Sequence, residues 1–236
     1  MLRLRRVLLA VVLLFLFAHL TVAQSVSSDG RELIKSGNAK YAKAEYESAL
    51  HDYRRVSPAA GESYAQALYN IGVCYYELWR TEDAIAMYEK AIEARGGRYP
   101  MASYSLGIAL EDLKRPAEAR TAYRQAIAAS KKISALAYFR LGLITANEDD
   151  CGTAVTLFRE ALSHSPGQFP AAHNNLGVTL ARTGRLREAE REFAIAVSQG
   201  KTSFPEAGDN LELCRSLLAA RTQIKVASLQ LITVSN

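Results

Sequence analysis

Residues 61–93, GESYAQALYNIGVCYYELWRTEDAIAMYEKAIE, contain the pattern that the rest of the chain repeats. The glycine of this stretch, Gly72, recurs at intervals of 35 residues. The five glycines in this register are Gly37, Gly72, Gly107, Gly142 and Gly177. A fixed period of this length predicts a stack of similar units, each of which buries its apolar face against its neighbours.

Two further positions recur with the glycine. An alanine follows twelve residues after each one, and an aromatic residue follows after sixteen. The alanines are Ala49, Ala84, Ala119, Ala154 and Ala189, and the aromatic residues are Tyr53, Tyr88, Tyr123, Phe158 and Phe193. Small residues at two facing positions allow two helices to approach closely, and the aromatic ring fills the space beside them.

This pattern resembles the tetratricopeptide repeat, a helix–turn–helix unit of roughly 34 residues. The resemblance covers about residues 29–221 and implies an all-α fold, a right-handed α-solenoid over residues 24–222. The expected repeats cover about residues 30–64, 65–99, 100–134, 135–169 and 170–204, followed by a capping helix over 205–222. Pro100, Pro170 and Pro205 suit the first position of a helix. Helices are therefore expected to begin near residues 65, 100, 135, 170 and 205.

The first residues are typical of a secretory signal peptide, residues 1–23. A charged start, MLRLRR, precedes a 14-residue apolar run, and Thr21-Val22-Ala23 forms a small-residue cleavage site. We expect cleavage after Ala23 and an exported protein, periplasmic or secreted. The alternative is a membrane anchor formed by an uncleaved segment, although the run is shorter than the ~20 residues of a spanning helix.

The composition argues against nucleic-acid binding and catalysis. Three of the 29 basic residues lie in the signal segment, which leaves 26 against 24 acidic residues and no basic cluster. No paired histidines at metal spacing, no phosphate-binding loop and no nucleophile motif occur, so we expect no enzyme, metal or cofactor. Cys74, Cys151 and Cys214 are expected to be three separate buried thiols.

The first helix of each repeat carries the candidate binding surface. Positions −6, −3, +1 and +4 from the repeat glycine share one helical face, which we name the first-helix face. The resemblance implies that this face lines a concave groove that binds peptides. In the fifth repeat it comprises Ala171, Asn174, Val178 and Ala181. The residues predicted to bind a partner are Ile34, Tyr41, Tyr69, Val73, Tyr76, Met101, Tyr104, Ile108, Leu136, Phe139 and Leu143.

Several of these side chains could equally be core between repeats, because first helices also contact their neighbours. An apolar, aromatic surface suits an apolar peptide or an amphipathic helix. We therefore expect a protein–protein adaptor with a protein or peptide partner and no membrane insertion beyond the signal segment. The alternative is a self-associating structural protein of the cell envelope, a homo-oligomer built on the same surface.

The C-terminal tail, residues 223–236, is short, apolar and strand-like, with the sequence QIKVASLQLITVSN. Two interpretations are open for it. The tail is either a frayed terminus or a segment that docks on a partner or back on the repeats.

Overall fold

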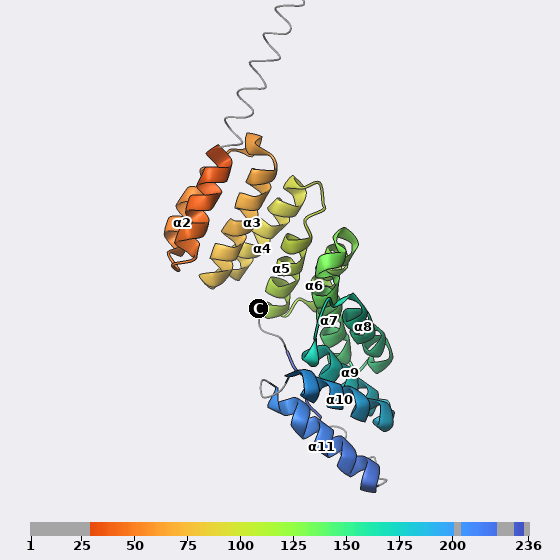
Figure 1. The fold of residues 1–236 in the computed structure, drawn as a ribbon. Helices are drawn as coiled ribbons and strands as arrows, with labels where there is room; N and C mark the ends of the chain where they lie inside the picture. The colour runs from red at the N-terminus through yellow and green to blue at the C-terminus, as the bar shows by residue number, and fades with distance from the viewer. Residues whose placement is uncertain (1–28, 201–203, 221–228, 234–236) are drawn as a thin grey trace, which may run out of the picture. The chain divides into compact units, whose positions relative to one another are not determined.

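The computed structural model describes residues 29–200, 204–220 and 229–233 (Figure 1). Within these ranges every regular element is a helix and no strand occurs, which confirms the predicted all-α class. The predicted signal peptide lies outside the described residues, as do residues 223–228 and 234–236 of the tail.

The chain divides into two compact units, Met1–Arg115 and Pro116–Asn236. Unit 1 contains a helix over residues 29–41, α2 (Tyr46–Tyr53), the short helix η1 (Pro58–Ala60), α3 (Glu62–Glu77), α4 (Thr81–Ala94) and α5 (Pro100–Asp112). Unit 2 contains α6 (Pro116–Ala129), α7 (Lys131–Asn147), α8 (Cys151–His164), α9 (Pro170–Arg182), α10 (Leu186–Gly200) and α11 (Pro205–Ala220). The boundary between the units falls inside the third predicted repeat.

Helices begin where the local sequence supplies a start. The prolines at 100, 170 and 205 occupy the first positions of α5, α9 and α11, as predicted. Two helices begin earlier than expected, α3 at Glu62 and α7 at Lys131. The Ser130 hydroxyl accepts a hydrogen bond from the Lys132 N–H (3.2 Å), so a serine N-cap starts α7.

The repeat glycines pack against the repeat aromatics inside each unit. A Cβ at Gly72 would lie 2.6 Å from Tyr88 Cε1, and a Cβ at Gly177 would lie 2.7 Å from Phe193 Cε1. Gly37 and Gly142 face Tyr53 and Phe158 in the same way. The glycine is needed because the aromatic ring occupies the space that a side chain would fill.

One turn geometry recurs in all five repeats and ends the first helix of each. The residue seven positions after the repeat glycine has a positive φ; these residues are Ala44, Trp79, Lys114, Asp149 and Gly184. In the second repeat, the Trp79 N–H donates to the Tyr76 carbonyl and the Arg80 N–H donates to the Tyr75 carbonyl. This pair of bonds is the Schellman motif, which favours glycine at the positive-φ position. Only the fifth repeat has glycine there.

Candidate functional site

A pocket of about 230 Å³ opens on the first-helix face of unit 1. It is lined by Asn38, Tyr41, Tyr53, Tyr69, Asn70 and Val73. Three of the predicted partner-binding residues, Tyr41, Tyr69 and Val73, therefore meet at one place. The pocket combines aromatic and aliphatic walls with two side-chain amides.

Hydrogen bonds hold the polar groups of this pocket in position. The Tyr53 hydroxyl donates to Asn38 Oδ1 (2.7 Å), and Asn70 Nδ2 donates to the same oxygen (3.0 Å). The Tyr41 hydroxyl donates to Glu77 (3.0 Å). Burial raises the pKa of Tyr53 to about 12 and also raises the pKa of Tyr41, so both hydroxyls stay neutral at physiological pH.

The other predicted residues of unit 1 differ in exposure. Met101 is 47% exposed, whereas Ile34, Tyr104 and Ile108 are buried. Tyr76 is half-buried, and its hydroxyl donates to Asp112. Of these residues, Met101 thus offers the most surface to a ligand.

In unit 2 the predicted residues lie mostly in the core. Phe139 and Leu143 are buried in the hydrophobic cluster of this unit, whereas Leu136 is 40% exposed. The Phe139 ring packs against the rings of Phe158 and Phe169, with centroids 5.9 and 5.0 Å apart. Phe139 and Leu143 offer little surface to a ligand in this conformation.

The C-terminal segment, residues 229–233, lies on unit 2 and is held by asparagine side chains. Asn175 makes two hydrogen bonds of 2.6 Å with Ile232: its Nδ2 donates to the Ile232 carbonyl, and its Oδ1 accepts from the Ile232 N–H. Asn210 does the same with Gln230, at 2.8 and 2.9 Å. Asn174 Nδ2 also donates to the Gln230 carbonyl (3.0 Å). The segment is thus bound through its backbone.

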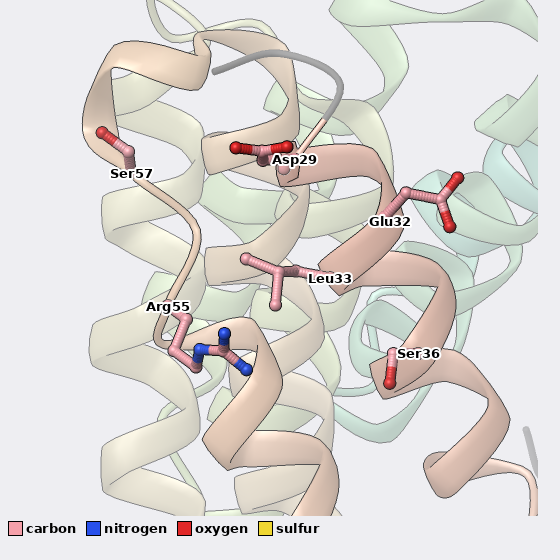
Figure 2. Close-up of a pocket in the computed structure, with 7 residues that line it drawn as sticks. Asp29, Glu32, Leu33, Ser36, Arg55 and Ser57 are labelled. Carbon is pink, nitrogen blue, oxygen red and sulfur yellow. The ribbon is translucent and has the colours of Figure 1, made fainter. Parts of the chain in front are cut away.

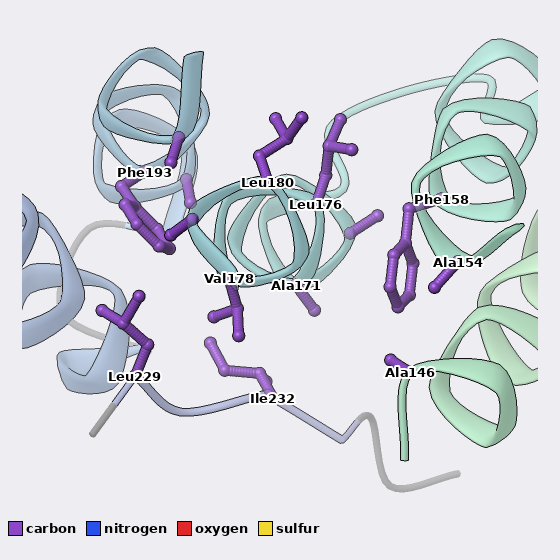
Figure 3. Packing of buried hydrophobic residues seen from close by; sticks show 14 of the residues in the cluster. Ala146, Ala154, Phe158, Ala171, Leu176, Val178, Leu180, Phe193, Leu229 and Ile232 are labelled. Atoms are coloured by element: carbon purple, nitrogen blue, oxygen red, sulfur yellow. The ribbon is translucent and has the colours of Figure 1, made fainter. Parts of the chain in front are cut away.

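Apolar contacts complete the docking of this segment. Leu229 and Ile232 are 3% and 6% exposed and belong to the hydrophobic cluster of unit 2. Figure 3 shows Val178 pointing from α9 toward Ile232. Asn174 and Val178 belong to the first-helix face of the fifth repeat, so the segment covers the predicted peptide-binding face there. The tail docks back on the repeats, and the frayed-terminus interpretation is wrong for these residues.

Sequence reasoning missed Asn175 and Asn210 as binding residues. Asn175 lies two positions before the repeat glycine Gly177, and Asn210 lies 35 residues further on, at the equivalent position of α11. Asn70 likewise lies two positions before Gly72 in the second repeat. A recurring asparagine next to the first-helix face was the signal. Its meaning could not be recognised because the position lies one residue away from the face that the helical spacing defines.

A larger hollow lies at the start of the described chain and carries no comparable arrangement. Its volume is about 610 Å³, and Figure 2 shows Asp29 and Glu32 on the first helix and Arg55 on the segment after α2. The rest of its lining is Gly30, Leu33, Ser36 and Ser57. These groups are mixed in charge and include no repeated amides, and the Ser36 hydroxyl is engaged by the Asp52 carboxylate, to which it donates a hydrogen bond (2.6 Å).

Three further observations concern the chemistry of the described residues. They contain no cluster of three or more potential metal ligands and no helix long and apolar enough to cross a membrane. Cys74 and Cys214 are buried free thiols, and burial raises the pKa of each to about 11. Cys151, predicted to be buried, is only partly so because it begins α8.

Comparisons with known proteins agree with this architecture. A family model described as tetratricopeptide repeat matches residues 30–99, 78–134, 104–168 and 139–204, which together cover more than half of the chain. A search of curated proteins gives no match.

Solved structures share the fold. MamA from Desulfovibrio magneticus is 20% identical with a TM-score of 0.61, covering 74% of this chain and 96% of that one. PilF from Pseudomonas aeruginosa is 18% identical with a TM-score of 0.67 and coverages of 87% and 90%. YrrB, described as a TPR protein with an unusual peptide-binding site, is 25% identical with a TM-score of 0.59 and coverages of 77% and 92%.

Proposed function

The chain belongs to the tetratricopeptide repeat family, and from that premise we propose that it is an adaptor that captures an extended apolar peptide on its first-helix face. The observation that carries the proposal is the docking of residues 229–233 in unit 2. Two asparagines each bond one N–H and one carbonyl of an extended backbone, while Leu229 and Ile232 are buried. This combination of backbone bonds and apolar anchors is a general mode of peptide recognition.

An extended peptide fits these contacts better than an amphipathic helix. In a helix, most backbone N–H and C=O groups are already bonded within the helix. They would not be available to the amides of Asn175 and Asn210. The proposed ligand is therefore a strand-like segment.

Unit 1 supports the proposal with a similar set of groups. Asn70 and Val73 of its pocket occupy the same repeat positions as Asn175 and Val178 of unit 2. Tyr41 and Tyr69 add aromatic area, which anchors peptides at a small cost in side-chain entropy. The relative YrrB is described as having a peptide-binding site, which supports the same use of the fold.

The proposed adaptor is not an enzyme and acts outside the cytoplasm. The support for export is the N-terminal pattern: a charged start, an apolar run and the cleavage site at Ala23. Intact-mass measurement of the protein from its native host should give a chain that begins at Gln24. A chain that retains Met1 and sediments with membranes would favour the anchored alternative.

A photo-crosslinking amino acid tests the peptide-binding face. We would place it at Val73, in the pocket of unit 1, and in a matched variant at Lys90, an exposed position on α4. Val73 should crosslink to an apolar segment of another protein, identified by mass spectrometry, and Lys90 should not. Equal crosslinking from both positions, or crosslinks from Lys90 alone, would contradict the proposal.

Self-association is the second candidate, and one observation favours it. The apolar segment that fits the first-helix face is part of this chain, so a second copy could supply it. Analytical ultracentrifugation over a range of concentrations distinguishes the two, because self-association makes the sedimentation coefficient depend on concentration.

A further inference from the structure

We propose that the C-terminal segment, residues 229–233, is an intramolecular competitor that closes the first-helix face of unit 2 until a partner peptide displaces it. This inference rests on the proposed function, because it assumes that the face binds peptides. It adds that the site is regulated by the chain itself.

The contacts with the segment are of a kind that another peptide could make. All five hydrogen bonds between the asparagines and the segment go to backbone atoms of Gln230 and Ile232. Backbone groups are the same in every non-proline residue, so these bonds do not require the tail's own sequence. Any extended strand with a suitable apolar side chain could replace the tail.

The surface under the segment suits both a covered and an uncovered state. Asn174, Asn175 and Asn210 are buried beneath the segment, and Asn210 Nδ2 also donates to Asn174 Oδ1 (2.8 Å). A buried amide without a hydrogen-bond partner would cost free energy. If the segment leaves, however, these amides become accessible to water, which can replace the hydrogen bonds that the segment made.

The apolar anchoring of the segment is small. Leu229 and Ile232 are buried and Leu231 is half-buried, whereas Gln230 and Thr233 are exposed. A contact of this size is weak between separate molecules. It suffices within one chain, because covalent linkage through a short connection raises the effective concentration of the segment at its site. A partner peptide with better anchors can then compete.

These contacts also define the chemistry of the partner. It is an extended peptide with apolar side chains at the positions of Leu229 and Ile232, three residues apart, and the exposed position of Gln230 places no demand on the side chain. Proline is excluded at the positions of Gln230 and Ile232, because each must donate an N–H to an asparagine.

Peptide binding to the full chain tests the proposal. The probe is a fluorescein-labelled synthetic peptide with the sequence of residues 223–236, and binding is followed by fluorescence anisotropy. The release variant, Leu229→Asp with Ile232→Asp, removes the two anchors of the tail. The matched control, Gln230→Asp with Thr233→Asp, adds the same charge at two exposed positions of the same segment.

The release variant should bind the probe at least about tenfold more tightly than the wild type or the control, because the internal competitor is lost. Adding Asn175→Ala and Asn210→Ala to the release variant should abolish binding. If the release variant and the wild type bind equally tightly, the tail does not compete and the inference fails, although the face still captures peptides. If neither binds, the proposed function fails for this face as well.

Hydrogen exchange on the unmodified chain provides an independent test, even if the release variant does not fold. Amides of residues 229–233 should exchange well before those of α9, because the tail opens without the helices unfolding. Equal protection of the tail and α9 would show that the tail is a permanent part of the core. A dimer of the wild type in which the tail docks on the second copy would also overturn the intramolecular proposal.

Discussion

Alanine at Gly142 should destabilise the protein, whereas alanine at Gly208 should stabilise it. Both glycines lie inside helices of unit 2, Gly142 in α7 and Gly208 in α11. A Cβ at Gly142 would lie 2.7, 2.8 and 3.0 Å from Cε1, Cδ1 and Cζ of Phe158. A Cβ at Gly208 would meet no atom within 4 Å. The same chemical change is therefore made in a filled space and in an open one.

The magnitudes follow from two opposing effects. Replacing glycine by alanine in a helix contributes about 1 kcal/mol of stability through lower conformational entropy of the unfolded chain. Overpacking a core costs about 1–3 kcal/mol. The upper end applies at Gly142, because three ring carbons lie far inside the usual 3.5–4.0 Å contact distance and the Phe158 ring is fully buried. We expect a loss of about 2 kcal/mol for Gly142→Ala and a gain of about 1 kcal/mol for Gly208→Ala.

Urea denaturation followed by circular dichroism measures both free energies of unfolding. Combining Gly142→Ala with Phe158→Leu adds a check, because a smaller, more flexible side chain can move away from the new methyl group. The double variant should lose clearly less stability than the sum of the two single variants. If Gly142→Ala stabilises the protein as much as Gly208→Ala does, the glycine–aromatic contact does not require glycine, and the packing argument is refuted.

Three other substitutions have outcomes that the structure predicts. Trp79 has a φ of 58°, a left-handed backbone conformation that is strained for residues other than glycine, and its side chain is 92% exposed. Trp79→Gly should therefore raise the free energy of unfolding by about 1 kcal/mol. An unchanged urea midpoint would show that the backbone of Trp79 is not strained. Ser103 is buried and its Oγ has no hydrogen-bond partner among the described residues, so Ser103→Ala should stabilise by about 1 kcal/mol, measured by thermal melting. A hydrogen bond from Lys40 (2.6 Å) lowers the pKa of Asp52 from 3.8 to about 2. The ionised Asp52 carboxylate therefore contributes its full stabilisation above about pH 4, and this stabilisation is lost as the pH falls through about 2. Asp52→Asn should therefore lower stability at pH 7 and flatten its dependence on pH in this acidic range; an identical pH dependence in both proteins would contradict this role.

The candidate site could be predicted only in part. The helical spacing placed Tyr41, Tyr69 and Val73 on one face, and these three residues line one pocket of unit 1. The same spacing gave Phe139 an equivalent position, yet this ring is enclosed by Phe158 and Phe169. Periodicity identifies the face that a residue occupies, but the neighbouring side chains determine how much of that face is left exposed.

The repeat pattern by itself determined the family, the helical class and the starts of the proline-led helices, because glycine, proline and small residues restrict the chain locally. The positive-φ turns were not apparent, since Ala44, Trp79 and Lys114 are not residues that favour that conformation. Only the tertiary structure decided where the tail lies. Its contacts join Gln230 and Ile232 to asparagines 20 and 57 residues away in the sequence, and a local pattern contains no information about such a pairing.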